Sequence, residues 1–546
     1  MHGAYNARIL SGGAVVGGND IRDGRVSGDA RAPLDPFRFM VLNLTLGVGH
    51  FLVLFNTGAY LPMIPYAAGA LGRAISYGDW TQANFFIAMA AGFPIAPRFA
   101  GRFGEVHTLV GAFVVFALAS AVCASTHDFW VFLLARGAQG FAGGVTVPVS
   151  LRGLLRHYRP DRRNLGLVLW GVAALMPFTL GPTLGGILIE ELGFRALFIL
   201  NVPIALAVAA LSTVVLFHRE SGLQSQPMDW RGLILLLGTL ACGLWAVDLA
   251  EVRDFWRSPI VETLGLASLV ALGLLVAWER GRKEPLVDVR LFARWNFTVG
   301  ALGLFLTGLL FQGLMAIFVI QYEVAMGYGP LWVGLLILPM AIFSKLASIL
   351  THRWMTRIDP RLIGMFALVG MGASCAFAAS YDRNASFDAL LWPQVVAGIF
   401  VGGLFPPFAA IGLSGLAGSA ELKASGVLNL LRVSGQAFGI PVFATLWEVR
   451  DIVHRHFVVE ADAAARAHIS QLQAALAAHG LRPSVAHAIL ARSLGRAAGE
   501  LAMGEVFYIA MWGFFALAGL CLLARPVIFA ESDKSVRLAA QELVEP

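Results

Sequence analysis

Charged residues are scarce in this sequence of 546 residues, because Asp, Glu, Lys and Arg make up only 14% of it. Soluble domains carry about 25% charged residues, so this scarcity excludes an ordinary soluble protein. Hydrophobic residues make up 58% of the chain and recur in runs long enough to cross a bilayer. A spanning helix needs about 20 apolar residues. The runs do not alternate with polar residues, which excludes a membrane β-barrel. We therefore expect an all-α polytopic membrane protein.

Several chemical signatures are also missing. The four cysteines lie far apart inside apolar runs, which excludes a disulfide framework and a zinc site. The sequence has no Ser/His/Asp grouping, metal cluster or phosphate-binding loop, so an enzyme is the least favoured reading. We expect no metal and no cofactor. The net charge of +6 comes from Arg residues in short loops between apolar segments, which argues against a nucleic acid partner. Residues 1–37 lack the apolar region of a signal peptide, and we expect a disordered cytoplasmic tail.

Hydropathy predicts fourteen spanning helices. They lie at about residues 39–62, 80–98, 107–125, 129–150, 165–189, 195–217, 230–250, 258–278, 297–321, 331–350, 362–381, 388–413, 426–448 and 504–524. Lys and Arg are concentrated in the loops on one side. The short loops of the other side contain only Arg73, Arg195, Arg253, Arg257 and Arg383. Because cytoplasmic loops carry the excess of positive charge, we expect both termini to be cytoplasmic.

A long segment, residues 449–503, separates the last two predicted spans on the outer side. It contains Ala-rich helical stretches at 463–477 and 485–498, broken at Gly480 and Pro483. Its five histidines fit no compact set of metal ligands, so we interpret them as solvated residues. The functional alternative is a docking surface for a partner outside the membrane.

Polar residues inside spans are costly in lipid and therefore indicate cavities or helix contacts. In span 129–150, Arg136, Gly140 and Gly144 share one face, with Gln139 beside them. We expect close packing with the guanidinium turned inward, and the alternative is an arginine that reaches the membrane interface. Interface placement is the favoured interpretation for Lys345. Glu323 closes its span at the outer side, as a residue of the substrate entrance or as a plain interface charge.

The span at 165–189 contains Leu-Gly-Pro-Thr-Leu-Gly-Gly at 180–186, preceded by Pro177. Pro177 and Pro182 interrupt the helical hydrogen bonds, while Gly181, Gly185 and Gly186 permit a close neighbour. This composition predicts a bent and tightly packed helix at a moving interface. A kink with a purely structural role is the alternative.

Two polar stripes mark the first and thirteenth spans. His50 and Thr57 lie on one face of the first, together with Asn43 and flanked by Asn56 and Tyr60. A second group shares a face of span 426–448, beside a small-xxx-small pair formed by Gly435 and Gly439. That group consists of Asn429, Arg432 and Gln436.

An ordered series of motifs resembles the fourteen-helix drug:proton antiporter branch of the major facilitator superfamily, typified by EmrB and QacA. The resemblance runs from about residue 45 to 525. It rests on R-x-x-Q-G at 136–140, G-P-x-L-G-G at 181–186, N-V-P at 201–203, the W-E…P-L-V-D…L-F…N-F connector at 278–297, W-P-Q at 392–394, L-S-G-L at 413–416 and N-x-x-R at 429–432.

Three departures from the branch stand out. The branch usually carries an acid in L-D-x-T of the first span, where this chain has Asn56. An amide cannot be deprotonated, so Asn56 cannot carry a proton there. Gly101 replaces the usual Asp of the loop between spans two and three. Glu323 replaces a common Gln, so an acid is lost at one position and gained at another.

The resemblance implies a major facilitator fold and alternating access. We expect a tail at 1–38, a six-helix bundle at 39–217, two additional helices with their loops at 218–296, a second six-helix bundle at 297–524 that includes a long periplasmic loop at 449–503, and a tail at 525–546. It further implies a bacterial inner membrane protein that exports amphiphilic drugs or toxic organic compounds by proton antiport, with the proton gradient as its energy source.

The same resemblance suggests roles for the residues above. The substrate cavity would be lined by His50, Asn56, Thr57, Tyr60, Asn429, Arg432 and Gln436, and coupling would involve Arg136, Gln139, His50 and Glu323. The hinge would be formed by Pro177, Gly181, Pro182, Gly185 and Gly186. A periplasmic adaptor of the EmrA type and an outer-membrane channel are the implied protein partners.

Two alternatives remain at this stage. One is a uniporter, or an exporter of a single endogenous metabolite such as a siderophore or a fatty acid, without the usual coupling; the absence of an acid at position 56 favours it. The other is a receptor or scaffold that keeps the transporter shell but moves no substrate. An adaptor gene next to the gene for this chain would favour export with partners over both.

Overall fold

The computed structural model describes residues 35–158, 180–216, 228–252, 257–355, 357–381, 385–460, 471 and 483–527. Within these residues the regular structure is helical. The first half contains α1 (Pro36–Ala59), α2 (Ile64–Ala70), α3 (Ile75–Phe103), α4 (Glu105–Ser125), α5 (Phe129–His157), a helical segment at 180–192, and α7 (Arg195–Leu216). Next come α8 (Trp230–Val252) and α9 (Pro259–Arg280).

The second half contains α10 (Trp295–Val319), α11 (Pro330–Trp354), α12 (Pro360–Ala379), α13 (Phe387–Val401), α14 (Pro406–Leu413), α15 (Ser419–Glu460) and α17 (Pro483–Leu523). A π-helical turn, Ile320–Ala325, continues α10. Many of these helices start with residues suited to a helix N-terminus. Proline opens α1, α9, α11 and α12, where its missing N–H has no intrahelical partner to lose. Asp128 and Asp359 accept hydrogen bonds from the first turns of α5 and α12.

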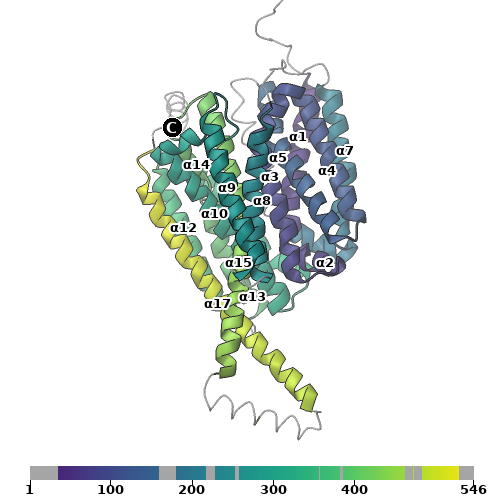
Figure 1. Ribbon diagram of the computed structural model, residues 1–546, viewed down its shortest axis with the longest axis vertical. Coiled ribbons are helices and arrows are strands. Elements are labelled where there is room, and N and C mark those ends of the chain that lie inside the picture. The colour runs from purple at the N-terminus through teal and green to yellow at the C-terminus, as the bar shows by residue number, and fades with distance from the viewer. Residues whose placement is uncertain are drawn as a thin grey trace, which may run out of the picture.

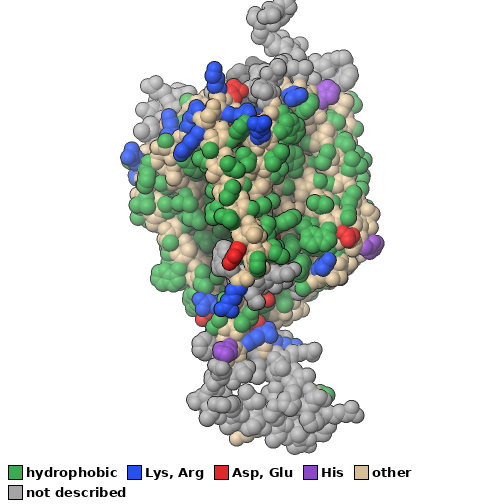
Figure 2. Space-filling model, in the orientation of Figure 1, with side chains coloured by type: hydrophobic (Ala, Val, Ile, Leu, Met, Phe, Trp, Pro, Cys, Tyr) green, Lys and Arg blue, Asp and Glu red, His purple; other side chains and the backbone are tan. Residues whose placement is uncertain are grey.

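Most of these helices are suited to a bilayer. In the described part of the chain, eleven are long and apolar enough to cross a membrane. The helices α3 and α5 are 29 residues long but too polar to be among these eleven. Several of their polar side chains, such as Gln82 and Arg136, are buried against other helices. Figure 2 shows hydrophobic side chains over the middle of the visible face and Lys and Arg toward its two ends. The chain is therefore a multi-pass membrane protein.

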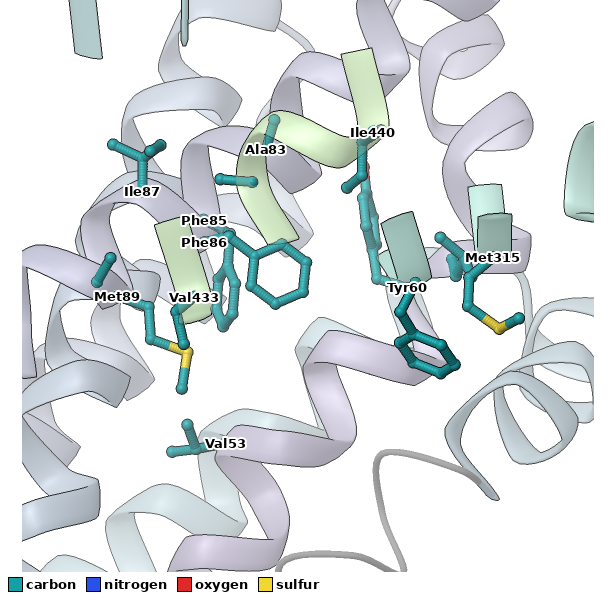
Figure 3. Close-up of a cluster of buried hydrophobic side chains, with 14 of the residues drawn as sticks. Val53, Tyr60, Ala83, Phe85, Phe86, Ile87, Met89, Met315, Val433 and Ile440 are labelled. Atoms are coloured by element: carbon teal, nitrogen blue, oxygen red, sulfur yellow. The ribbon is translucent and has the colours of Figure 1, made fainter. Parts of the chain in front are cut away.

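The helices form two groups (Figure 1). In one, α3 packs on α5, and α4 packs on α5 and α7; in the other, α10 packs on α15 and α12 packs on α17. The additional helices α8 and α9 pack on each other, and α8 also contacts α3 and α15. A continuous apolar cluster joins the groups: Val53, Phe85 and Met89 of the first lie in it with Met315 and Val433 of the second (Figure 3).

The two ends of the helix bundle differ. At the terminal end, the start of α10 lies beside the end of α17, since Trp295 Nε1 donates to the carbonyl oxygen of Leu523 at 2.7 Å. At the opposite end, α15 and α17 cross and project beyond the other helices (Figure 1). We call the projecting parts, residues 449–460 and 483–503, the arm, and this end the arm end. Glu505 joins its two helices, because its carboxylate lies 3.2 Å from His454 Nε2 and 3.5 Å from Arg450 Nε.

The structure corrects two expected boundaries. The loop expected at 449–503 is shorter, because 449–460 continue α15, and 483–503, which include the helical stretch predicted at 485–498, continue α17. A helix needs no apolar residues to continue into water, so hydropathy ended these spans too early. The span expected at 388–413 is confirmed as one candidate membrane span, Phe387–Leu413, which is interrupted at Gly402–Phe405 between α13 and α14. Residues 36–38, expected in the tail, begin α1; residues 1–34, 461–470, 472–482 and 528–546 lie outside the described part.

Candidate functional site

Arg136 lies at the centre of a buried polar cluster among the first helices. Its side chain is 0% exposed, which confirms that the guanidinium turns inward and rules out the interface alternative. Its Nη1 donates to Gln139 Oε1 at 2.6 Å, and its Nη2 donates to Gln82 Oε1 on α3. Gln139 Nε2 in turn donates to Ser120 Oγ on α4 at 2.8 Å. One cation thus connects three helices.

Aromatic rings enclose the same guanidinium. Its Cζ lies 4.3 Å from the ring centre of Tyr60, 4.4 Å from that of Phe85 and 5.7 Å from that of Phe198. A cation is attracted to the face of an aromatic ring, and more strongly where water is excluded. No carboxylate of the described residues forms an ion pair with Arg136. Amide oxygens and ring faces therefore stabilise this buried charge. We call Arg136, Gln139, Gln82, Tyr60, Phe85 and Phe198 the arginine cluster.

Asn56 forms a closed pair with Asn201 of α7. Asn56 Nδ2 donates to Asn201 Oδ1 at 3.1 Å, and Asn201 Nδ2 donates to Asn56 Oδ1 at 2.8 Å. Asn56 Nδ2 also donates to the carbonyl oxygen of Leu52. Both side chains are buried. Asn56 therefore lies in the contact between α1 and α7, and this position differs from the cavity wall that we expected.

The rest of the α1 stripe is also packed among helices. His50 and Thr57 are buried, and the carbonyl oxygen of Thr57 accepts a hydrogen bond from Gln82 Nε2 at 2.8 Å. The Tyr60 hydroxyl pairs with Thr81 Oγ1 at 2.8 Å. The structure thus joins Thr57 and Tyr60 to the arginine cluster. A groove of about 450 Å³ lies elsewhere, on the outside of α11–α13, where Leu346 and Phe366 are among its exposed apolar residues.

On α15, Gly435 and Gly439 pack against the backbone of α10, as the small-xxx-small pair predicts. A Cβ at these positions would meet the carbonyl oxygens of Phe305 and Leu309. Asn429, Arg432 and Gln436 follow the same helix; Arg432 lies 5.7 Å from the ring centre of Phe405, and Gln436 is buried.

The segment 180–186 forms a contact between the two groups of helices. A Cβ at Gly181 or Gly185 would meet the backbone of Ala59 at the end of α1, and one at Gly186 would meet the carbonyl oxygen of Pro330 at the start of α11. Small residues at these positions allow three backbones to approach at once. Pro182 is buried in this contact, while Pro177 lies outside the described residues.

Two hydrogen bonds extend this contact. Thr183 Oγ1 donates to the carbonyl oxygen of Gly334 at 2.7 Å, and the backbone N–H of Leu331 donates to Glu190 Oε2 at 3.2 Å. Because α1 ends and α11 begins at the arm end, the two groups of helices are closed against each other there.

Two ionisable side chains near the middle of the second half have buried polar atoms without a hydrogen-bond partner among the described residues. One is Glu323, whose carboxylate oxygens are both buried at the end of α10. Electrostatic interactions link Tyr66 of α2 to both Glu323 and Glu190, so Glu323 lies near the contact between the groups. The other is Lys345, whose Nζ is buried. The expected interface placement of Lys345 was therefore wrong.

The connector after α9 fastens the additional helices to the first group. Trp278 Nε1 donates to Asp229 at 3.1 Å, and Glu279 accepts the backbone N–H of Leu286 at 2.8 Å. Arg98 at the terminal end of α3 then donates to the carbonyl oxygen of Glu284 at 2.8 Å. The connector residues thus hold α8 and α9 against the end of α3, a role that their sequence pattern alone did not predict.

Comparison with known proteins identifies the family. The Major Facilitator Superfamily model matches residues 46–440. The chain belongs to the major facilitator superfamily. This is a family of membrane transporters rather than enzymes, and the helices described above form its fold.

Among curated superfamily members, the chain is 28% identical over 494 residues to the fatty acid resistance protein FarB of Neisseria gonorrhoeae, covering 90% of this chain and 97% of FarB. It is 27% identical over 496 residues to the multidrug export protein EmrB of Escherichia coli K12, again covering 90% and 97%. These matches support the resemblance to the EmrB-like branch.

Solved structures share the fold at low identity. A bacterial homologue of the human lysosomal transporter Spinster, in an inward-facing and unoccupied conformation, matches with a TM-score of 0.55 and 15% identity, covering 90% of this chain and 98% of that one. An auto-inhibited POT family peptide transporter matches with a TM-score of 0.59 and 13% identity, covering 89% and 97%.

Sequence reasoning missed several residues of the arginine cluster and the partner of Asn56. Gln82, Phe85 and Phe198 belong to the arginine cluster, and Asn201 pairs with Asn56. Gln82 carried a usable signal, since a polar amide within an apolar span must find a partner. The two phenylalanines carried none, because nothing distinguishes a cation-stacking ring from the many other Phe residues of the chain.

Proposed function

We propose that the chain is a secondary active exporter of amphiphilic drugs or other toxic organic compounds, which works by alternating access with proton antiport. The observation that carries the proposal is the backbone contact of Gly181, Gly185 and Gly186 with the end of α1 and the start of α11. This contact holds the two bundles together by close packing, with two cross-bundle hydrogen bonds at it among the described residues. It can therefore open and re-form during transport.

The orientation follows from charge. Lys and Arg are concentrated in the loops of the terminal end, so that end is cytoplasmic in our proposal and the arm is periplasmic. Closure at the arm end then corresponds to a state that is open toward the cytoplasm. An amphiphile enters from the cytoplasm or the inner leaflet and leaves after the bundles rock about a site near the midplane.

The names of the relatives support the substrate class. EmrB is a multidrug export protein and FarB is a fatty acid resistance protein. Both kinds of compound are amphiphilic. A second candidate, export of one endogenous amphiphile such as a fatty acid without proton coupling, is favoured by the Asn56–Asn201 pair, which leaves no acid at that position of α1.

The arm supports a proposal about partners. It extends two helices of the second bundle beyond the membrane and is held by ion pairs of Glu505 with Arg450 and His454. We propose that a periplasmic adaptor of the EmrA type docks there and connects the transporter to an outer-membrane channel. Removal of residues 461–482, which connect the two helices of the arm in the sequence, should abolish adaptor binding in pull-down with a candidate adaptor while transport in proteoliposomes continues. Binding that survives the deletion would contradict the docking proposal.

Transport is best tested in proteoliposomes with two probes, ethidium as a lipophilic cation and a fluorescent fatty acid as a lipophilic anion. We expect uptake of at least one probe into inside-out oriented vesicles to depend on an imposed pH gradient and to stop when the gradient is dissipated. Gly186→Ala should reduce the uptake strongly, and Gly69→Ala should not, because a Cβ at Gly69 meets open space.

The outcomes separate the candidates. Transport of both probes with a pH gradient supports the drug antiporter. Transport of the fatty acid alone, indifferent to the gradient, supports the uncoupled metabolite exporter. Transport of neither probe in any condition would favour the receptor or scaffold over both.

A further inference from the structure

Two acids lie buried between α3 and the additional helix α8. Asp79 is 5% exposed and Asp248 is 1% exposed. Asp79 lies near the start of α3, which begins at the arm end, and Asp248 lies near the end of α8. The two helices pack against each other, and Asp79 is the charged residue that acts electrostatically on Asp248. Neither acid is a member of the arginine cluster or of the contact at 180–186, but Asp79 acts electrostatically on Tyr60 of that cluster.

This pair has no cation to neutralise it within the described residues. Neither Asp79 nor Asp248 forms an ion pair with Lys, Arg or His. A buried carboxylate is costly unless it is paired, and two neighbouring carboxylates cannot both ionise without mutual repulsion. The low-energy state of such a pair carries at least one proton.

Charged groups on the surrounding helices form ion pairs elsewhere or are open to solvent. On α15, Arg450 pairs with Glu505, and Asp451 pairs with Arg455 and lies against Gly499 of α17. Glu448 is partly exposed, and Glu262 at the arm end of α9 is exposed. None of these groups acts on Asp248.

Several unsatisfied polar atoms occur on α8 and α15. Both of its carboxylate oxygens are buried without a hydrogen-bond partner in the described residues. Trp245 Nε1, one turn away on α8, is a buried donor without a partner, and Thr445 Oγ1 on α15 is another. Native interiors rarely leave such groups unsatisfied, so the unpartnered carboxylate of Asp248 indicates that it binds a species such as a proton.

Helix geometry places Thr445 at about the level of Asp248 along the bundle. The ring of Phe438 on α15 lies against Gly243 on α8, which sets these two residues at one level. Thr445 is two turns beyond Phe438 on the same face, and Asp248 is five residues beyond Gly243 in the same direction. Thr445 therefore lies on the face of α15 that meets α8, at about the height of the acid.

We propose that Asp79 and Asp248 form the proton-binding site of this transporter, and this inference rests on the proposed proton antiport. A proton from water bonds to a carboxylate oxygen of one acid, and the loss of that acid's negative charge removes its repulsion of the other acid. The proton returns to water when the site is hydrated again. Because the site lies where α3 and α8 meet α15 of the other bundle, separation of the bundles changes its access to water. The two carboxyl groups can bind and release a proton, which the amide of Asn56 cannot do.

Two measurements test the site. The first is infrared difference spectroscopy of the purified full chain between acidic and alkaline buffer, which detects the carbonyl stretch of a protonated buried carboxyl group. We expect a band in the wild type that is lost in both Asp79→Asn and Asp248→Asn. Asp388→Asn is the matched control, because Asp388 is an exposed acid in the first turn of α13. A band unchanged in both variants would overturn the proposal. A band abolished by sodium but not by potassium would assign the pair to a sodium ion and equally overturn it.

The second measurement is transport of the same probes in proteoliposomes. In both variants we expect loss of gradient-driven transport but retention of substrate exchange at equal pH, which also shows that the variants are folded. Gradient-driven transport that persists in both would overturn the coupling role of the pair. A wild type that is indifferent to the gradient would instead refute the proposed antiport, and the infrared band would then decide proton binding by itself.

Discussion

Asn56 and Asn201 exchange two hydrogen bonds across the contact between α1 and α7, at 3.1 and 2.8 Å. Each amide satisfies the other, so the pair contributes a neutral, fully bonded contact where the branch usually has an ionisable side chain. This pair explains how the chain tolerates an amide at position 56, because the side chain of Asn201 satisfies the hydrogen bonds of Asn56.

The first prediction concerns this pair. Replacing Asn56 or Asn201 by Ala leaves the other amide buried and unsatisfied, and each variant should lose about 1–3 kcal/mol of stability. The double variant should lose clearly less than the sum, because no unpaired amide remains. Thermal unfolding of the four proteins in detergent measures this coupling. Additive losses would show that the two hydrogen bonds contribute little.

A second prediction concerns Arg136. Arg136→Lys keeps the charge but loses the planar group that bonds Gln82 and Gln139 together and lies over Tyr60. We expect transport to fall by roughly tenfold or more, since hydrogen bonds to charged groups contribute about 1.5–3 kcal/mol each. Arg38→Lys is the control, because Arg38 is exposed at the start of α1. Equal transport by both variants would mean that the geometry of the guanidinium is unimportant.

The third prediction concerns closure of the arm end. In Gly186→Ala the new methyl group overlaps the carbonyl oxygen of Pro330, and such overpacking typically costs about 1–3 kcal/mol. The bundles should separate at the arm end, so hydrogen–deuterium exchange of segments 180–192 and 330–336 should increase. Gly69→Ala should leave exchange there unchanged. Slower exchange in Gly186→Ala would contradict the close contact between Gly186 and Pro330.

A fourth prediction follows from Asp359, which caps α12 outside the membrane-spanning helices. Hydrogen bonds from the Arg361 guanidinium lower the pKa of Asp359 below its ordinary value of 3.8. The stabilising contribution is therefore fully present above that value and is lost as the pH falls through the lowered pKa. Asp359→Asn should remove this acid-dependent part of the stability, which thermal unfolding at a series of pH values measures.

Ser386→Ala provides the comparison for this pH dependence. Ser386 caps α13 by accepting the N–H of Ala389 at 3.3 Å and does not titrate. Its loss should cost about 1 kcal/mol at every pH. A pH-independent loss in Asp359→Asn as well would show that the Asp359 carboxylate does not act through its charge.

The sequence predicted what depends on local spacing. The apolar runs located the membrane helices, and Gly435 and Gly439 predicted close packing because residues four apart share a face. The inward direction of Arg136 followed from its depth within a glycine-lined span. Predictions failed where they considered only the distance of a residue from the helix end and not the neighbouring helices. Lys345 is near enough to a helix end to reach water, yet its Nζ is buried.

Pairings between distant segments could not be predicted. Asn56 and Asn201 are 145 residues apart, and Gln82 and Arg136 are 54 apart. Their contacts require that α1 lie against α7 and α3 against α5, which one sequence does not encode in any local pattern. The same holds for Asp79 and Asp248, each of which alone is a single polar residue near a helix end.

The arm has a mechanical consequence. At 42 residues, α15 is about 63 Å long, roughly twice the thickness of the hydrocarbon core. The same helix packs on α10 and α3 in the membrane, so it cannot tilt there without swinging its far end. A small rotation of α15 at the bundle contact therefore produces a larger displacement of its end at Glu460. A protein bound at that end would bind the two states of the transporter with different affinity, and its binding would in turn favour one of the two states.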